Sequence, residues 1–246
     1  MQRLIDRQEA GRLLAGELDR FAGRADTVVL GLPRGGVVVA FEIARVLDLP
    51  LDVFMVRKLG APGQEELAVG AIASGDARVL NDEIVRALHL SESQLEAIAT
   101  RGKALLEERE RLYRGHAQAL DLEGKQVVVV DDGLATGATM RIAVHSLRAH
   151  RPAGIVVAVP VAPEETCSIL VGEADEVVCL LRPFPFYSIG SWYEDFSQTS
   201  DQEVVDLLER ARVHRLDLPA GLEEAHMRAL VEPGVADKAR VRREHV

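Results

Sequence analysis

The sequence contains few aromatic residues, few cysteines and no long hydrophobic run. Ten of its 246 residues are aromatic and two are cysteine. Two cysteines in apolar segments cannot build a disulfide framework or a metal site, so we expect Cys167 and Cys179 to be buried in a reducing compartment. The start of the chain lacks the apolar core of a signal peptide, and no stretch reaches the roughly 18 apolar residues of a spanning helix. These absences predict a soluble, cytoplasmic protein with no membrane partner.

Positive charge is also scarce. Lysine and arginine total 29 against 39 aspartate and glutamate residues, which gives a formal net charge of −10. Proteins that hold nucleic acid through its backbone carry a basic surface, so we expect no nucleic-acid partner. Hydrophobic residues make up 48% of the chain, enough to bury a substantial core. The length fits one large domain, or a core with a small appendage.

Short apolar segments alternate with segments of helical periodicity along most of the chain. This rhythm predicts an α/β fold, a doubly wound and mainly parallel sheet with helices on both faces. The expected strands cover residues 27–30, 51–56, 126–130, 154–161 and 176–181. The expected helices cover residues 8–21, 37–47, 137–150, 164–171 and 201–212.

The middle of the chain departs from this rhythm. Residues 67–73 and 78–80 have the pattern of a hairpin, and residues 91–114 that of a long helix with capping-box spacing between Ser91 and Gln94. We therefore expect one domain over residues 1–218 with a small insert of hairpin and helices. This domain would contain a mobile loop at about 58–68, a helical insert at about 81–120 and a hood segment that binds the acceptor at about 182–200. A C-terminal appendage would follow it at 219–246.

Residues 127–139 read VVVVDDGLATGAT and carry the clearest chemical signal. An apolar strand runs into Asp131 and Asp132 at the edge where parallel sheets bind ligands. The uncharged loop that follows ends at a helix N-terminus, where backbone N–H groups can surround a phosphate. Two carboxylates beside such a cradle suit hydroxyl groups or a divalent cation, so a sugar phosphate fits the segment. A P-loop lysine and the G-x-G-x-x-G dinucleotide motif are both missing, and an ordinary strand-to-helix turn is the remaining alternative.

The same string resembles the phosphoribosyl-pyrophosphate (PRPP) motif of type I phosphoribosyltransferases, and looks most similar to adenine and uracil members. The resemblance covers about residues 27–206. It implies that Asp131 and Asp132 bind the ribose hydroxyls. It also implies a 5′-phosphate site formed by Ala135, Thr136, Gly137, Ala138 and Thr139. Members that use hypoxanthine or guanine carry an acid at the position of Ala135, so that residue's role is not carried over and the acceptor subclass stays open.

Two further segments agree with this family. The glycine-rich loop at 32–36 resembles its pyrophosphate loop, with Arg34 for charge and Gly35 and Gly36 exposing backbone amides to an anion; a tight turn with a solvated arginine is the alternative. Arg57 and Lys58 resemble the basic pair that opens the family's mobile loop, which would close over pyrophosphate and exclude water.

Six of the ten aromatic residues lie between Phe184 and Phe196. In the hypoxanthine-guanine members an aromatic and apolar segment at the equivalent place stacks on the base. We expect Phe186 or Tyr187 to bind the acceptor, since base–aromatic stacking contributes about 1–3 kcal/mol in single-strand binders. A small secondary core or a dimer contact is the alternative, and a homodimer is compatible with it.

These features predict a Mg²⁺-dependent phosphoribosyltransferase of nucleotide metabolism that displaces pyrophosphate from PRPP with a nitrogen acceptor, a nucleobase. The catalytic candidates are Asp131, Asp132, Arg57 and Lys58, with Mg²⁺ held through PRPP. A non-catalytic PRPP- or nucleotide-sensing protein of the same fold is the main alternative. A phosphatase or phosphorylase acting on ribose phosphates is a weaker one.

Overall fold

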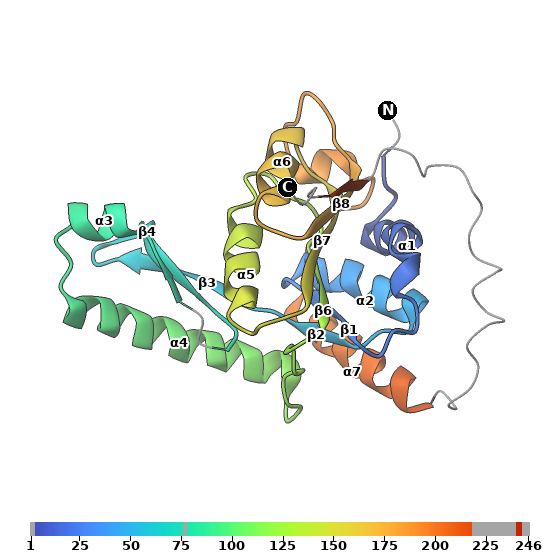
Figure 1. Cartoon of the computed structure of the whole chain (residues 1–246), viewed down its shortest axis with the longest axis horizontal. Helices are drawn as coiled ribbons and strands as arrows, with labels where there is room; N and C mark the ends of the chain where they lie inside the picture. The colour runs from blue at the N-terminus through green and yellow to red at the C-terminus, as the bar shows by residue number, and fades with distance from the viewer. Residues whose placement is uncertain (1–2, 76–77, 218–239, 243–246) are drawn as a thin grey trace.

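The computed structural model describes residues 3–75, 78–217 and 240–242. It shows a central sheet between two layers of helices, with an arm of three strands and two helices projecting to one side (Figure 1). The helices are α1 (Arg7–Glu17), α2 (Gly35–Leu47), α3 (Asp82–Ala87), α4 (Glu92–Arg114), α5 (Ala138–Arg148), α6 (Glu164–Val171) and α7 (Asp201–Asp217). The strands are β1 (Thr27–Gly31), β2 (Leu51–Val53), β3 (Val56–Ala61), β4 (Gln64–Ala73), β5 (Arg78–Leu80), β6 (Gln126–Val130), β7 (Gly154–Val161), β8 (Glu176–Leu181) and β9 (Arg240–Arg242).

The central sheet has the strand order β2-β1-β6-β7-β8-β9. Its first five strands are parallel, and β9 pairs antiparallel with β8 at one edge. The α/β prediction is therefore confirmed. The expected appendage at 219–246 lies mostly outside the described residues, but residues 240–242 belong to the sheet rather than to a separate tail.

The strands of this sheet are apolar on both faces, as expected for parallel strands that helices cover on each side. Every residue of β1 and β7 is buried, as are four of the five residues of β6. One face packs against α1, α2 and α7, and the other against α5 and α6 (Figure 1). Cys167 and Cys179 are free thiols in this core, as expected. Covered faces leave the strand ends as the place where polar side chains reach solvent.

The arm is an antiparallel sheet of β3, β4 and β5 that packs against α4, with α3 at its end (Figure 1). The expected hairpin of residues 67–73 with 78–80 and the helix of residues 91–114 are both confirmed. Ser91 and Gln94 form the capping box, with the side chain of each accepting from the backbone of the other.

The segment 58–68 is not a loop but a β-hairpin. Residues 56–61 and 64–73 pair, and Gly63 adopts a positive φ in the turn between them. Its inward residues explain the difference, because Leu59 and Ala61 are buried in a cluster with Leu106 of α4. Any motion of this hairpin stays a prediction. The strand expected at 51–56 is likewise divided, since β2 ends at Val53 and β3 starts a second sheet.

A polar network joins the arm to the central sheet at the end of β2. Arg114 of α4 lies 2.9 Å from Asp52 and 3.0 Å from Glu110, and it donates to the carbonyl oxygen of Val53. The side chains of Arg114 and Asp52 are 10% and 6% exposed. The hydroxyl of Ser74, at the end of β4, donates to Glu110 and accepts from the backbone of Met55. Paired and largely buried charges thus connect the arm to the end of β2, in addition to the apolar contacts of Tyr113 and Ala73 with the central core.

Within the described part of the chain, no helix combines the length and the apolar character that crossing a membrane requires.

Candidate functional site

The candidate site lies where β1 and β6 end side by side. Asp131 and Asp132 follow β6, and the glycine-rich loop follows β1. The backbone N–H of Leu32 donates to the carbonyl oxygen of Val130 at 2.8 Å and holds the loop against the strand end. The two motifs that are about 100 residues apart in the sequence therefore meet at one edge of the sheet, as the parallel topology requires.

The two glycines of this loop make the close approach possible. A Cβ atom on Gly35 would lie 1.8 Å from Oδ2 of Asp132, and one on Gly36 would lie 2.7 Å from the carbonyl oxygen of Val130. Neither position has room for a side chain while the acids keep their place. The peptide bond between Pro33 and Arg34 is cis.

The acidic pair is partly buried and its two charges repel one another. The backbone N–H of Asp132 donates to Oδ1 of Asp131 at 2.9 Å. Burial raises the pKa of Asp131 well above its ordinary value, and the charge of Asp132 raises it further. Burial also raises the pKa of Asp132, against the opposing effect of the Arg7 guanidinium. Such a pair binds hydrogen-bond donors readily, because a donor relieves the repulsion between two carboxylates.

The segment 135–139 forms the turn into α5. Gly137 is the N-terminal cap of this helix, with a φ of +69°, and Ala138 is its first residue. The hydroxyl of Thr166 donates to the carbonyl oxygen of Ala135 at 2.7 Å, which holds the turn against α6. Ala135, Thr136 and Thr139 are exposed. Backbone N–H groups at this helix N-terminus are therefore open to an anion.

Arg34 stands at the start of α2 and interacts with a polar cluster formed by α4 and α7. The Tyr113 hydroxyl donates to Asp201 at 2.6 Å, and Arg109 lies 2.9 Å from the same carboxylate. The Tyr113 hydrogen bond, helped by Arg109 and by the charge of Arg34, lowers the pKa of Asp201. Burial and the same hydrogen bond raise the pKa of Tyr113 to about 12. The cluster thus places one acid, Asp201, and one arginine, Arg109, close enough to the glycine-rich loop for Asp201 to feel the charge of Arg34.

Arg57 and Lys58 are exposed residues of β3 in the arm, not of the strand next to β1. In the described part of the chain, neither side chain forms a hydrogen bond or ion pair with Asp131 or Asp132. The structure therefore brings the loop at 32–36 to the acids but leaves this basic pair on the separate hairpin.

The aromatic segment packs over the acidic motif. Ile189 contacts Gly133, where an added Cβ would lie 2.5 Å from its Cγ2 atom. Phe186 packs against a cluster that includes Trp192 and Tyr193, whereas Tyr187 is 82% exposed. One of the two acceptor candidates is thus largely a packing residue and the other is free to contact a ligand.

Two residues of the site were not expected from the sequence. The Tyr193 hydroxyl donates to the carbonyl oxygen of Asp132 at 2.7 Å, and Arg7 forms an ion pair with the Asp132 carboxylate. Tyr193 belongs to the aromatic segment, which was the available signal for it. Arg7 is one arginine among several charged residues near the start of the chain, and nothing in the sequence distinguishes it.

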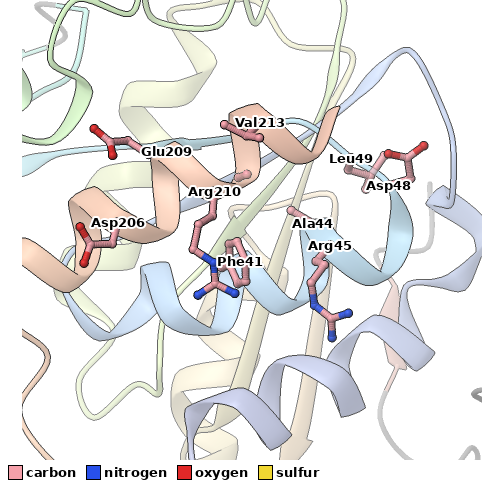
Figure 2. Close-up of a pocket in the computed structure, with 10 residues that line it drawn as sticks. Phe41, Ala44, Arg45, Asp48, Leu49, Asp206, Glu209, Arg210 and Val213 are labelled. Carbon is pink, nitrogen blue, oxygen red and sulfur yellow. The ribbon is translucent and has the colours of Figure 1, made fainter. Parts of the chain in front are cut away.

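A separate cavity of about 710 Å³ lies between α2 and α7 (Figure 2). Its lining includes Phe41, Arg45 and Arg210, and the Arg210 guanidinium lies 4.9 Å from the centre of the Phe41 ring. None of the residues assigned above to the candidate site lines this cavity. Among residues 3–75, 78–217 and 240–242 there is also no group of three or more histidine, cysteine, aspartate or glutamate residues able to hold a metal ion.

Comparison with known proteins agrees with this geometry. Residues 5–190 match the family described as the phosphoribosyl transferase domain. Two Mycobacterium tuberculosis proteins, from strains CDC 1551 / Oshkosh and ATCC 25618 / H37Rv and provisionally named phosphoribosyl transferases, are 47% identical over 225 residues. The match covers 92% of this chain and 50% of each relative, so the chain spans about half the length of these relatives.

The crystal structure of the protein TT1426 from Thermus thermophilus is 44% identical, with a TM-score of 0.74, over 85% of this chain and 99% of that one. The family match, the sequence identity and the meeting of the two motifs at one sheet edge lead to the same conclusion: the chain belongs to the phosphoribosyltransferase family.

Proposed function

We propose that this chain transfers the 5-phosphoribosyl group of PRPP to a nitrogen acceptor, a nucleobase, and releases pyrophosphate. The observation that carries the proposal is the contact between the acidic pair after β6 and the glycine-rich loop after β1. PRPP has two vicinal hydroxyls, a 5′-phosphate and a diphosphate on one ribose. Carboxylates flanked by two anion-binding loops match those three groups.

In the proposed reaction the bond between C1 of ribose and the diphosphate oxygen breaks, and a bond between C1 and the acceptor nitrogen forms. Pyrophosphate leaves with the electron pair, and the acceptor nitrogen loses its proton. Asp131 and Asp132 accept hydrogen bonds from the ribose hydroxyls. Their negative charge also favours the positive charge that develops on the ribose as the C1–O bond breaks.

The anionic groups of PRPP are assigned to the two turns. The 5′-phosphate would lie at the N-terminus of α5, among the backbone N–H groups of Ala135, Thr136, Gly137, Ala138 and Thr139. The diphosphate would lie against Arg34, Gly35 and Gly36. Arg57 and Lys58 would add positive charge to the leaving group when the hairpin of the arm approaches it.

The acceptor would lie beside the segment at 182–200. Tyr187 is the more available ring, because Phe186 is partly occupied by packing.

Magnesium fits this site as an ion held mainly by the substrate. Mg²⁺ keeps several waters and binds phosphate oxygens in most phosphoryl sites, and no protein side chain is assigned here as its ligand. When bound, it would neutralise the charge of the leaving diphosphate.

The test combines binding and turnover. Calorimetry should show PRPP binding in the presence of Mg²⁺, and pyrophosphate release should appear with one or more members of a panel of nucleobases and small amines. Asp131→Asn with Asp132→Asn should abolish release and weaken PRPP binding. Glu107→Gln with Glu108→Gln, which removes two charges from an exposed part of α4, is the control and should change neither.

PRPP binding without release for any acceptor would overturn transfer and favour a sensing protein. No PRPP binding by the wild type, or full turnover in the double aspartate variant, would overturn the site.

A further inference from the structure

Arg7, the first residue of α1, lies against the acidic pair. Its Nε atom is 2.7 Å from Oδ2 of Asp132, and the two side chains are 10% and 14% exposed. Its Nη1 atom donates to the carbonyl oxygen of Ser197 at 2.7 Å, and its guanidinium lies 3.9 Å from the centre of the Phe196 ring. The guanidinium is thus held by a ring on one face and by hydrogen bonds at two nitrogens.

The start of the chain is itself fastened to the aromatic segment. The backbone N–H of Leu4 donates to the carbonyl oxygen of Trp192 at 2.9 Å, and that of Glu194 donates to the carbonyl oxygen of Leu4 at 2.8 Å. Asp6 caps α1 by accepting from the backbone of Glu9. These bonds fix the first turn of α1, and with it the position of Arg7.

The ion pair determines which carboxylate oxygens remain available. Oδ2 of Asp132 is bound to Arg7 and lies against the backbone of Gly35, and Oδ1 of Asp131 accepts from the backbone of Asp132. Among the described residues, no other residue donates a hydrogen bond to Oδ1 of Asp132 or to Oδ2 of Asp131. One free oxygen on each acid leaves two acceptors, as many as the vicinal hydroxyls of a ribose.

We propose that Arg7 is a positioning residue of the PRPP site, which orients the Asp132 carboxylate so that each acid offers one oxygen to a ribose hydroxyl. This inference rests on the proposed function. Arg7 itself touches no substrate in this role. It acts through Asp132, and it links the acidic motif to both the glycine-rich loop and the aromatic segment.

The electrostatic part of the role has a defined direction. Burial raises the pKa of both acids, and the positive charge of Arg7 opposes that effect on each. The other titratable or charged groups around this pair and Arg7 are Asp6, Tyr193, Asp195 and, next to Gly35 in the chain, Arg34. Removing the charge of Arg7 therefore raises the pKa of the pair further, so the acids take up protons at a higher pH.

The experiment uses Arg7→Met, which keeps an aliphatic side chain and removes the charge. We measure the PRPP dissociation constant with Mg²⁺ by calorimetry across pH 5–9. We also titrate the aspartate side-chain carboxyl carbons of the free protein by NMR. The methionine variant should bind PRPP on the order of tenfold more weakly at pH 7, a change of about 1.4 kcal/mol. The acidic limb of its plot of PRPP affinity against pH should move to higher pH, and so should the midpoint of its carboxyl titration.

Arg7→Lys should recover part of the affinity and return the midpoint toward the wild type, because it restores the charge without the forked geometry. Arg12→Met, an exposed arginine on the same helix, is the control and should leave both curves unchanged. If the methionine variant is too unstable to titrate, Arg7→Gln replaces it.

A loss of affinity that is equal at every pH, with an unmoved carboxyl titration, would overturn the inference and leave Arg7 with a purely structural role. If the wild type binds PRPP and Arg7→Met changes neither the affinity nor the carboxyl titration, the positioning role is overturned while the proposed function stands. If the wild type binds no PRPP, the proposed function fails and the positioning role fails with it, whereas the carboxyl titration still reports whether Arg7 controls the acids.

Discussion

The central sheet and the arm bury their residues in different ways. Strands β1, β6 and β7 of the parallel sheet are covered by helices on both faces. Polar side chains can therefore reach solvent only where these strands end. The sheet of β3, β4 and β5 packs against α4, and Arg57 and Lys58 remain exposed along β3. The first region thus places its acids at the ends of buried strands, whereas the second presents positive charges on an exposed strand, and motion of that strand toward the site stays a prediction.

Substitutions in the two regions should change the free energy of unfolding by different amounts. The largest change is expected at the polar network that joins the arm to the central sheet. Arg114→Met leaves the buried carboxylate of Asp52 without its cation and removes the ion pair of the partly buried Glu110, so the free energy of unfolding should fall by about 3–5 kcal/mol. Urea denaturation measures it.

Arg111→Met, an exposed arginine in the last turns of the same helix, is the control and should change stability by less than about 0.5 kcal/mol. Similar small losses in both variants would show that the arm is not anchored through Arg114.

The second prediction concerns the candidate site. Gly35→Ala places a methyl group where Oδ2 of Asp132 lies, so the carboxylate must leave its ion pair with Arg7. Stability should fall by about 1–3 kcal/mol, and PRPP binding should weaken on the order of tenfold or more. Thermal unfolding and calorimetry measure the two effects.

Gly16→Ala in α1 is the matched control, because nothing lies within 4 Å of its added Cβ. It should be neutral or slightly stabilising, since alanine favours a helix over glycine. Unchanged PRPP affinity in Gly35→Ala would mean that the position of Asp132 does not matter for binding.

The third prediction concerns the exposed cations of the arm. Arg57→Gln with Lys58→Gln should alter stability by less than about 0.5 kcal/mol, because both side chains are exposed. Turnover should nevertheless fall on the order of a hundredfold, since in the proposed reaction these two cations stabilise the leaving diphosphate. Steady-state pyrophosphate release measures it.

Arg101→Gln with Lys103→Gln removes the same number of positive charges from α4 and should leave turnover near the wild-type value. Equal losses in the two double variants would indicate a general effect of the arm's charge rather than contact with the substrate.

Much of the central sheet could be predicted because its signal is local. The run of valines at 127–130 is too apolar for a one-sided strand, and the structure places it between two helical layers. The capping box of Ser91 and Gln94 was likewise predicted from spacing and confirmed. Such patterns are read from neighbouring residues, without knowledge of the fold.

The arm was harder to predict for a physical reason. Glycine and proline at 60–63 suggested a loop, but Leu59 packs on Gly102 of α4, where an added Cβ would lie 2.4 Å from its Cδ2 atom. That packing partner is more than 40 residues away in the chain, and tertiary contact overrides local propensity in a strand. For the same reason the position of Arg57 and Lys58 could not be predicted. They belong to the sheet of the arm and not to the central sheet, where they were expected.

The sequence by itself determined the α/β class, the acidic pair and the two turns beside it, because strand, turn and helix signals repeat in order along the chain. Only the tertiary structure decided that the glycine-rich loop contacts Asp132 and that Arg7 binds one carboxylate oxygen of Asp132. It also decided that the basic pair, Arg57 and Lys58, lies on a separate arm. These are contacts between residues far apart in the chain. Their existence depends on how the sheet and its helices pack, which local patterns do not encode.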